Sequence, residues 1–322
     1  MILQIAKLPP PIGGVTIHVK RLLASLKTID NMEVGILDYS KERNVLHIIQ
    51  KIINAKIVHL HVTKKMLRLL LVLFFRLLGK KVIITFHGQY IFQNILDKYS
   101  LKFSSASILL NQISFNAASD IRKNKIFLIG AFIPPIESDV VPLDEKLITK
   151  IKEFKSNFNF VYATNAFNYA LDPQGKETYM GSELVSFFEM NKDIGLIFSD
   201  PTGNYYKYLV GIYKDLPKNV LFISQPHDFI NVIKITDGLI RATTTDGDSL
   251  SVKEALYYRK TVMATGVVDR PSDVLIFNSF DELQYLISNK IKNNSHSYVI
   301  NNFDDILKVY LEMNISCSQK QI

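Results

Sequence analysis

The stretch LIRATTTDGDSLSVKEALYYRKTVMAT at residues 239–265 carries most of the information about the fold of this 322-residue chain. It begins as an apolar strand, passes through a polar loop, continues as a helix that carries Glu254, and ends as a second strand. A strand, a helix and a parallel strand in this order form a βαβ unit. Asp248 or Ser249 can cap the helix, and the N–H groups of its first turn suit a phosphate.

The same alternation of short apolar runs and helical patterns extends over the whole chain. Strands are expected at 1–6, 33–39, 56–62, 81–87, 106–111, 125–132, 158–164, 194–200, 219–225, 238–243 and 261–265. Helices are expected at 16–27, 42–53, 64–78, 90–99, 181–190, 204–213, 227–235, 250–259, 279–292 and 302–313. Continuous Val, Ile and Leu runs separated by helices predict parallel sheets buried on both faces.

A polar stretch after Pro134–Pro135 divides this alternation in two. The predicted fold is therefore α/β, with two tandem Rossmann-like, doubly wound domains that face a central cleft. We expect an N-terminal domain at 1–140, a C-terminal domain at 141–300, and a helix with a polar tail at 301–322 that can cross back. Ligands of doubly wound sheets bind beyond the carboxyl ends of the strands, so we expect one in the cleft.

Composition limits the class of protein. With 48 % hydrophobic and 21 % charged residues, the chain is an ordinary folded protein rather than a disordered or collagen-like one. Cys317 is the only cysteine, which excludes a disulfide framework, thiolate zinc sites and iron–sulfur clusters within one chain. The net charge of +8 favours anionic partners, but no nucleic-acid motif accompanies it, so we expect no nucleic-acid partner.

The densest basic segment is KKMLRLLLVLFFRLLGKK at 64–81. Its apolar part is too short to span a bilayer. One interpretation is a helix packed on a sheet with basic ends, and the other is a helix that docks on an anionic membrane surface. The N-terminal residues lack the apolar core of a signal peptide, so we expect a cytoplasmic protein, with peripheral attachment to the inner membrane face under the second interpretation.

Two motifs in the first half also point to a ligand. Gly13 and Gly14 lie between a strand and a helix, where backbone N–H groups can approach an anion, although a tight turn explains two glycines equally well. His87 ends the strand ITFH, where a doubly wound sheet presents ligand-binding groups. His59 and His61 alternate on another strand, and packing is favoured over a metal pair because no carboxylate lies nearby in the sequence.

These motifs together resemble glycosyltransferase family 4, whose members are retaining enzymes with two Rossmann-like domains (the GT-B fold). The resemblance rests on the Gly13–Gly14 loop, on TFHG, and on an acidic residue followed eight positions later by Glu in the segment 239–265. It implies that Gly14 contacts the donor diphosphate, His87 the transferred sugar, Asp246 the sugar hydroxyls and Glu254 the ribose. Ser249 and Leu250 would offer backbone N–H groups to the phosphates, next to the loop residue Asp248.

One departure from this family concerns the cations that hold the diphosphate. The usual Gly-Arg and Lys-Gly are replaced by Thr164–Asn165 and Met180–Gly181, which resembles a bacterial surface-polysaccharide subgroup with Asn165–Ala166 at the first position. Two leaving-group charges still need compensation. The candidate cations are Arg241, Lys176 and Arg270, and Arg241 ranks first because it flanks the acidic loop.

The resemblance implies a hexosyltransferase-type retaining glycosyltransferase (EC 2.4) that moves a sugar from a nucleotide-diphosphate sugar, with UDP favoured, to a polysaccharide or lipid-linked oligosaccharide. No cofactor and no metal are expected, although Asp246–Gly247–Asp248 has the form of a metal-binding Asp-x-Asp string. Two alternatives remain open: a nucleotide-sugar epimerase on the same fold, and a non-catalytic subunit that binds a nucleotide sugar.

Overall fold

A computed structural model describes residues 1–10, 12–88, 91–291 and 301–318 of the chain. By their internal contacts the residues divide into two compact units. Unit 1 consists of Met1–Ile133 with Asn301–Ile322, and unit 2 consists of Pro134–Ile300. The division falls near the polar stretch after Pro134–Pro135, and the segment that follows residue 300 belongs to unit 1.

Unit 1 is built on one parallel sheet of six strands in the order β2-β1-β3-β4-β5-β6. The strands are β1 (Ile2–Ala6), β2 (Val34–Asp38), β3 (Ile57–Leu60), β4 (Lys81–Phe86), β5 (Ala106–Leu109) and β6 (Ile126–Leu128). The helices are α1 (Gly14–Lys27), α2 (Val45–Asn54), α3 (Lys65–Leu77), α4 (Ile95–Phe103), α5 (Gln112–Ser119) and α12 (Phe303–Ser318), with short 3-10 turns at Ile91–Gln93 and Glu137–Asp139, the latter in unit 2.

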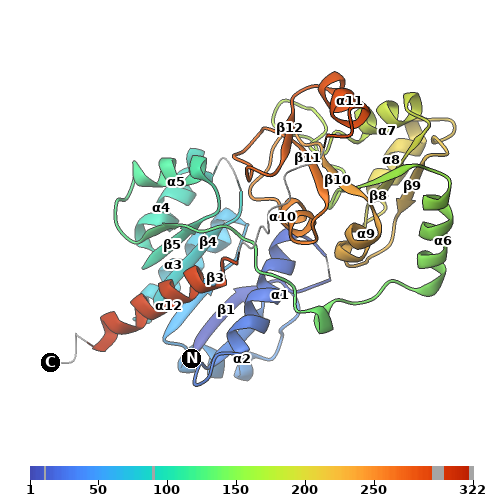
Figure 1. The fold of residues 1–322 in the computed structure, drawn as a ribbon. Coiled ribbons are helices and arrows are strands. Elements are labelled where there is room, and N and C mark those ends of the chain that lie inside the picture. The colour runs from blue at the N-terminus through green and yellow to red at the C-terminus, as the bar shows by residue number, and fades with distance from the viewer. Residues whose placement is uncertain (11, 89–90, 292–300, 319–322) are drawn as a thin grey trace. The chain divides into compact units, whose positions relative to one another are not determined.

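The alternating side chains of the strands separate the two faces of this sheet. Leu3, Val58 and Ile84 belong to the larger apolar cluster, which α2, α3, α4 and α5 cover. On the opposite face, Ala6 packs against Val19 and Leu23 of α1. Helix α12, red in Figure 1, lies along the strands of unit 1 and contributes buried side chains. A segment that follows unit 2 in the sequence thus completes the core of unit 1.

Unit 2 contains a second parallel sheet of six strands, in the order β12-β11-β10-β7-β8-β9. The strands are β7 (Phe160–Asn165), β8 (Ile194–Ser199), β9 (Val220–Ile223), β10 (Gly238–Arg241), β11 (Thr261–Thr265) and β12 (Leu275–Phe277). The helices are α6 (Glu145–Ser156), α7 (Gly181–Met190), α8 (Asn204–Ile212), α9 (Phe229–Ile235), α10 (Leu250–Tyr257) and α11 (Phe280–Ser288).

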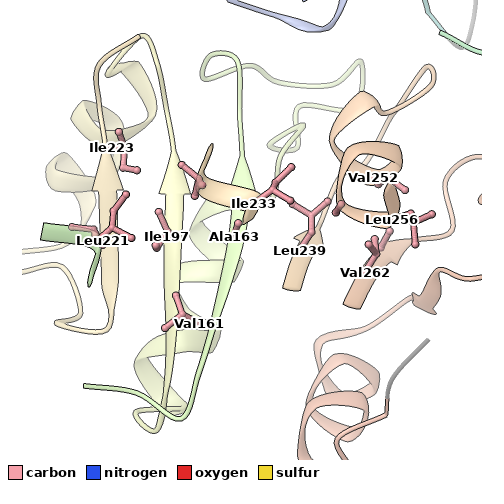
Figure 2. Packing of buried hydrophobic residues seen from close by; sticks show 14 of the residues in the cluster. Val161, Ala163, Ile197, Leu221, Ile223, Ile233, Leu239, Val252, Leu256 and Val262 are labelled. Carbon is pink, nitrogen blue, oxygen red and sulfur yellow. The ribbon is translucent and has the colours of Figure 1, made fainter. Parts of the chain in front are cut away.

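The core of unit 2 also has two faces. One cluster joins Val161, Ile197 and Leu239 of the strands to Val252 and Leu256 of α10 (Figure 2). The other joins the opposite side chains of the same strands to α7, α8 and α11. The sheet is therefore buried on both faces, which explains why its strands are almost continuously apolar.

Both sheets contain a point at which the strand order reverses. In unit 2 the chain proceeds from β7 to β8 and β9, and β10 then pairs with the other edge of β7. In unit 1 the strands β2 and β3 pair with opposite edges of β1. The loops that follow the two central strands of such a point diverge, and they leave a crevice at the carboxyl ends of the strands.

The predicted α/β class with two doubly wound parallel sheets is confirmed, and each of the 11 expected strands is present. Three elements were missed, namely α5, α6 and β12. Helix α1 begins at Gly14, two residues before the expected start, and the helix expected at 90–99 begins at Ile95. Residues 90 and 292, the ends of two expected helices, lie outside the described residues.

Candidate functional site

The strand-order reversal of unit 2 brings together Asn165, the last residue of β7, and Arg241, the last residue of β10. The Arg241 Nη1 atom donates to the backbone oxygen of Asn165 at 3.0 Å. The guanidinium group also lies over the ring of Tyr179, 5.1 Å from its centre. Arg241 is thereby fixed at the carboxyl edge of the sheet, where ligands of doubly wound domains bind.

Asp246 joins two arginines at this edge. Its carboxylate accepts from Arg241 Nε at 3.2 Å and from Arg270 Nη1 at 3.1 Å. Arg241 Nη2, at 3.4 Å, and the backbone N–H of Gly247, at 3.0 Å, also donate to this carboxylate. An ionised carboxylate has about four acceptor positions, so these four donors are enough to fill them.

The charges of this cluster hold one another in their ionised forms. Burial raises the pKa of Asp246, but the positive charges of Arg241 and Arg270 outweigh burial and lower it below its usual value. Burial lowers the pKa of Arg270, although a guanidinium keeps its proton in proteins. Two cations and one anion leave a net positive charge at the carboxyl ends of β10 and β11.

Arg270 has an unused donor. Its side chain is only 3 % exposed, and its Nη2 atom is buried with no hydrogen-bond partner among the described residues. A buried charged donor without a partner is costly, and an anionic ligand with oxygen acceptors would satisfy it. The cluster therefore combines a net positive charge with one unsatisfied donor.

The acidic loop continues into α10, which begins at Leu250. Ser249 is the N-cap residue, but its hydroxyl contacts Ser251 at 3.0 Å and makes no capping bond. Asp248 pairs with Lys253 at 2.5 Å. Of the two expected capping residues, Ser249 is therefore excluded. Glu254 is buried on the same helix.

The third candidate cation, Lys176, lies apart from this cluster. It occupies an exposed turn in which its backbone N–H donates to Asp172. The next residue, Glu177, accepts from the hydroxyl of the buried Tyr205 at 2.6 Å and from the backbone of Ser182. The segment between β7 and α7 is thus fixed by Glu177 and Tyr205, and Lys176 stays in solvent.

In unit 1, Gly13 and Gly14 lie at the start of α1, after β1. The backbone of Gly13 is extended, and its N–H donates to the hydroxyl of Thr16 at 3.0 Å. Neither glycine has a positive φ. A Cβ atom at Gly14 would meet nothing within 4 Å. Neither a tight turn nor packing against the protein requires glycine at position 14, whereas close approach of a ligand to the backbone would.

His87 follows β4 and belongs to a group of four histidines. His18 of α1, His59 of β3, and His61 lie with it, and neighbouring ring centres are 4.1–5.6 Å apart. The sequence did not reveal this group, because the four residues meet only through the strand order β1-β3-β4. Within the described residues, no set of three or more His, Cys, Asp or Glu side chains is arranged to hold a metal ion.

Two doubly wound units of this kind define the GT-B class of fold. Solved structures similar to this chain include Anabaena HepE in complex with UDP-glucose, with 12 % identity, 99 % of this chain and 100 % of that chain covered, and a TM-score of 0.66. Another is S. aureus MnaA with UDP, with 12 % identity, 97 % of both chains covered and a TM-score of 0.65.

A third is sucrose-phosphate synthase from Thermosynechococcus elongatus, with 11 % identity, 99 % of this chain and 98 % of that chain covered, and a TM-score of 0.62. At these identities the likeness shows the fold. No family model matches the sequence, and no curated protein matches it.

Proposed function

We propose that this chain is a retaining glycosyltransferase that moves a sugar from a UDP-sugar to a polysaccharide or lipid-linked oligosaccharide. The observation that carries the proposal is the Arg241–Asp246–Arg270 cluster, with its buried and unpartnered Arg270 Nη2, at the strand-order reversal of unit 2. HepE has been crystallised with UDP-glucose and MnaA with UDP, and this supports a UDP-sugar as donor.

In this proposal the two arginines replace the missing Gly-Arg and Lys-Gly cations. Arg270 Nη2 donates to a phosphate oxygen of the donor, and Arg241 contributes positive charge from the other side of Asp246. Asp246 keeps both guanidinium groups in place. Contact between Asp246 and sugar hydroxyls stays a prediction, because a hydroxyl would have to replace one of its present donors.

The remaining roles follow from the resemblance to glycosyltransferase family 4. Ser249 and Leu250 offer backbone N–H groups to the phosphates, and Glu254 accepts from the ribose. Gly14 offers its backbone N–H to the diphosphate, and His87 contacts the transferred sugar. Asn165 and Gly13 shape the two loops, while Lys176 and Asp248 are the weakest members of the set, because Lys176 is in solvent and Asp248 is paired with Lys253.

The reaction needs no protein nucleophile. The bond between the anomeric carbon and the phosphate oxygen breaks, and the acceptor hydroxyl oxygen bonds to the same face of the sugar. The departing phosphate oxygen takes the hydroxyl proton. The protein's contribution is orientation and stabilisation of the leaving diphosphate by cations.

Binding of UDP tests the site. We expect UDP and one or more UDP-sugars to raise the unfolding temperature, because a ligand that binds only the folded state stabilises it. Replacing Arg270 by Gln should weaken UDP binding about tenfold to a hundredfold. Replacing the exposed Lys218 of the same unit by Gln is the control and should leave binding unchanged. Equal binding by the parent and the Arg270→Gln variant would contradict the proposed site.

Turnover separates the alternatives. With donor and acceptor, a glycosyltransferase forms a glycoside, whereas an epimerase converts the donor with no acceptor present. A binding subunit would bind the donor without turnover. We expect full activity in EDTA. Loss of activity that Mn²⁺ restores would instead assign Asp246 and Asp248 to a metal.

We also propose that the acceptor lies at a membrane surface and that the protein binds there. The charge of the chain supports it, because residues 43–119 contain 11 of the 38 Lys and Arg but only one of the 30 acidic residues, Asp97. Asp97 is buried and pairs with Arg68, which is itself buried and so does not add to the exposed positive charge of this segment. The excess of Lys and Arg over Asp and Glu in the whole protein therefore comes from this one segment.

The helices of this segment also expose apolar side chains. Helices α2, α3 and α4 cover the same face of the sheet of unit 1, so their outer sides face the same way. The exposed apolar residues are Val45, Leu46, Ile49 and Ile53 of α2, Met66, Leu70, Phe74 and Leu77 of α3, and Ile95, Tyr99 and Phe103 of α4. An apolar surface within a positive segment fits an anionic bilayer. Among the described residues, no helix is long and apolar enough to cross one.

Vesicle co-sedimentation tests this surface. We expect binding to vesicles that contain phosphatidylglycerol and much less to phosphatidylcholine vesicles. Replacing both Leu70 and Phe74 by Ser should weaken binding at least tenfold, and Met190→Ser, at an exposed apolar site of unit 2, should not. Absence of vesicle binding, or a self-association that the double substitution abolishes, would contradict the membrane assignment.

A further inference from the structure

A chain of hydrogen bonds connects helix α12 to His87. The hydroxyl of Tyr310 on α12 lies 2.8 Å from Gln4 Nε2 on β1, and Gln4 Oε1 lies 3.0 Å from His61 Nε2. His61 Nδ1 in turn lies 3.2 Å from His87 Nε2. A side branch runs from Tyr310 to His59 Nδ1 at 2.5 Å, and from His59 Nε2 to the hydroxyl of Thr85 at 2.8 Å.

The members of this chain behind His87 are shielded from water. Gln4, His59 and Tyr310 are fully buried, and His61 is 1 % exposed. Burial lowers the pKa of His61 and of His87 well below the usual value, and the neighbouring histidines lower both further. Each imidazole is therefore neutral near pH 7 and carries one N–H, on one of its two nitrogens.

The orientation of the Gln4 side-chain amide determines which ring nitrogen of His61, and hence of His87, carries the proton. The amide nitrogen donates to Tyr310, so the amide oxygen must accept from His61 Nε2. With its proton on Nε2, His61 accepts at Nδ1, and His87 must then donate from Nε2. His87 Nδ1 is left without a proton and able to accept one. Reversing the amide would reverse every donor in the chain and put the proton on His87 Nδ1.

We propose that Tyr310 and Gln4 are positioning residues that hold His87 in the tautomer with the proton on Nε2, through His61. This inference rests on the proposed function, in which His87 contacts the transferred sugar, and it assigns a functional role to α12. A hydrogen-bond acceptor at His87 Nδ1 suits a hydroxyl group of the sugar, which donates its proton.

The tautomer can be measured without any activity. In the full-length protein labelled with ¹⁵N-histidine, the ring nitrogens of protonated and unprotonated positions have separate chemical shifts, and single His substitutions assign the signals. We expect His87 to carry its proton on Nε2. In the Tyr310→Phe variant the amide of Gln4 loses its acceptor, so we expect a mixture of the two His87 tautomers. A proton on Nδ1 in the parent protein, or an unchanged tautomer in the variant, would overturn the proposal.

Kinetics supply the second measurement. In Tyr310→Phe we expect kcat to fall about tenfold with little change in KM for the donor, by analogy with residues that orient metal-bound histidines, which contribute about tenfold to a hundredfold to activity. Ile306→Val, which changes a buried residue of the same helix outside the hydrogen-bond chain, should change neither kcat nor the tautomer. A kcat in Tyr310→Phe equal to that of the parent would overturn the positioning role.

The two measurements also separate this proposal from the proposed function. If no sugar transfer is detected but the His87 signals behave as expected, the proposed function fails and the tautomer control stands. If sugar transfer is detected but the Tyr310→Phe substitution does not change the tautomer of His87, the proposed function stands and the tautomer control fails.

Discussion

Gly181, the first residue of α7, shows how one hydrogen atom in place of a methyl group determines local packing. A Cβ atom at this position would lie 2.2 Å from Cε1 of the buried Tyr205. We expect Gly181→Ala to lower the free energy of unfolding by about 1–3 kcal/mol, the usual cost of overpacking. Gly211 in α8 is exposed, with nothing within 4 Å of its Cβ position. Gly211→Ala should therefore stabilise the protein by about 0.5–1 kcal/mol. Urea denaturation of both variants measures the contrast, and equal effects would refute it.

Asp246 is the residue on which the arrangement of the two arginines depends. Asp246→Asn keeps the shape of the side chain but leaves Arg241 and Arg270 side by side without a counter-charge. Removing one partner of a buried ion pair typically costs about 3–5 kcal/mol, and we expect a loss of this size in urea denaturation. Asp193→Asn changes an exposed residue of the same unit and should change stability by less than about 0.5 kcal/mol. A loss in Asp246→Asn no larger than in this control would show that the cluster is not held by Asp246.

At the scale of elements, α12 stabilises unit 1 through one side. Ile306 is buried on this side and Leu311 is 46 % exposed on the other. We expect Ile306→Ala to cost about 2–4 kcal/mol, because it leaves a cavity in the core, and Leu311→Ala to cost less than about 1 kcal/mol. Thermal unfolding of the two variants compares them. Similar losses would mean that α12 does not pack as described.

The sequence predicted the strands well because each is a run of apolar residues that must be buried on both faces. It missed α6, since this helix fully buries only Leu147 and Ile151 and most of its other residues are polar. The eight-residue α5 and the three-residue strand β12 are too short to show a period. Elements that bury few side chains leave little pattern in a sequence.

Only part of the candidate site could be predicted from the sequence, because some of its contacts join residues that are far apart in the chain. Arg241 could be chosen because it is near the acidic loop along the chain, and Arg270 because it follows the next strand. The contact between Asp246 and Arg270, and that between Tyr310 and His59, depend on strand order and on α12 returning to unit 1. Contacts between residues that are far apart in the sequence have no local pattern.

At the scale of the whole molecule, the buried histidines predict that stability falls in mild acid. Burial and the nearby His18 lower the pKa of His59 to about 3 in the folded protein, against about 6.5 when it is unfolded. Between these values the unfolded chain binds a proton that the folded protein does not, so stability is full above pH 6.5 and is lost as the pH falls. His61 behaves in the same way. The groups that contact His59 are Tyr310, Thr85 and His61.

From pH 7 to pH 5.5 we expect a loss of about 1.3 kcal/mol for each of His59 and His61. Urea denaturation at the two pH values measures it. His59→Gln should reduce the total loss by the share of His59, about 1.3 kcal/mol, whereas His47→Gln, at an exposed site on α2, should leave it unchanged. A free energy of unfolding that is constant over this range would contradict the neutral, buried state of these histidines.

The return of α12 to unit 1 has a consequence for biosynthesis. A ribosome completes residues 134–300 before it produces the helix that carries Tyr310, so unit 2 can fold while unit 1 still lacks part of its interior. The half of the protein that is translated first is then the half that matures last. Until α12 emerges, the nascent chain presents the uncovered side of β1 and β3 to chaperones.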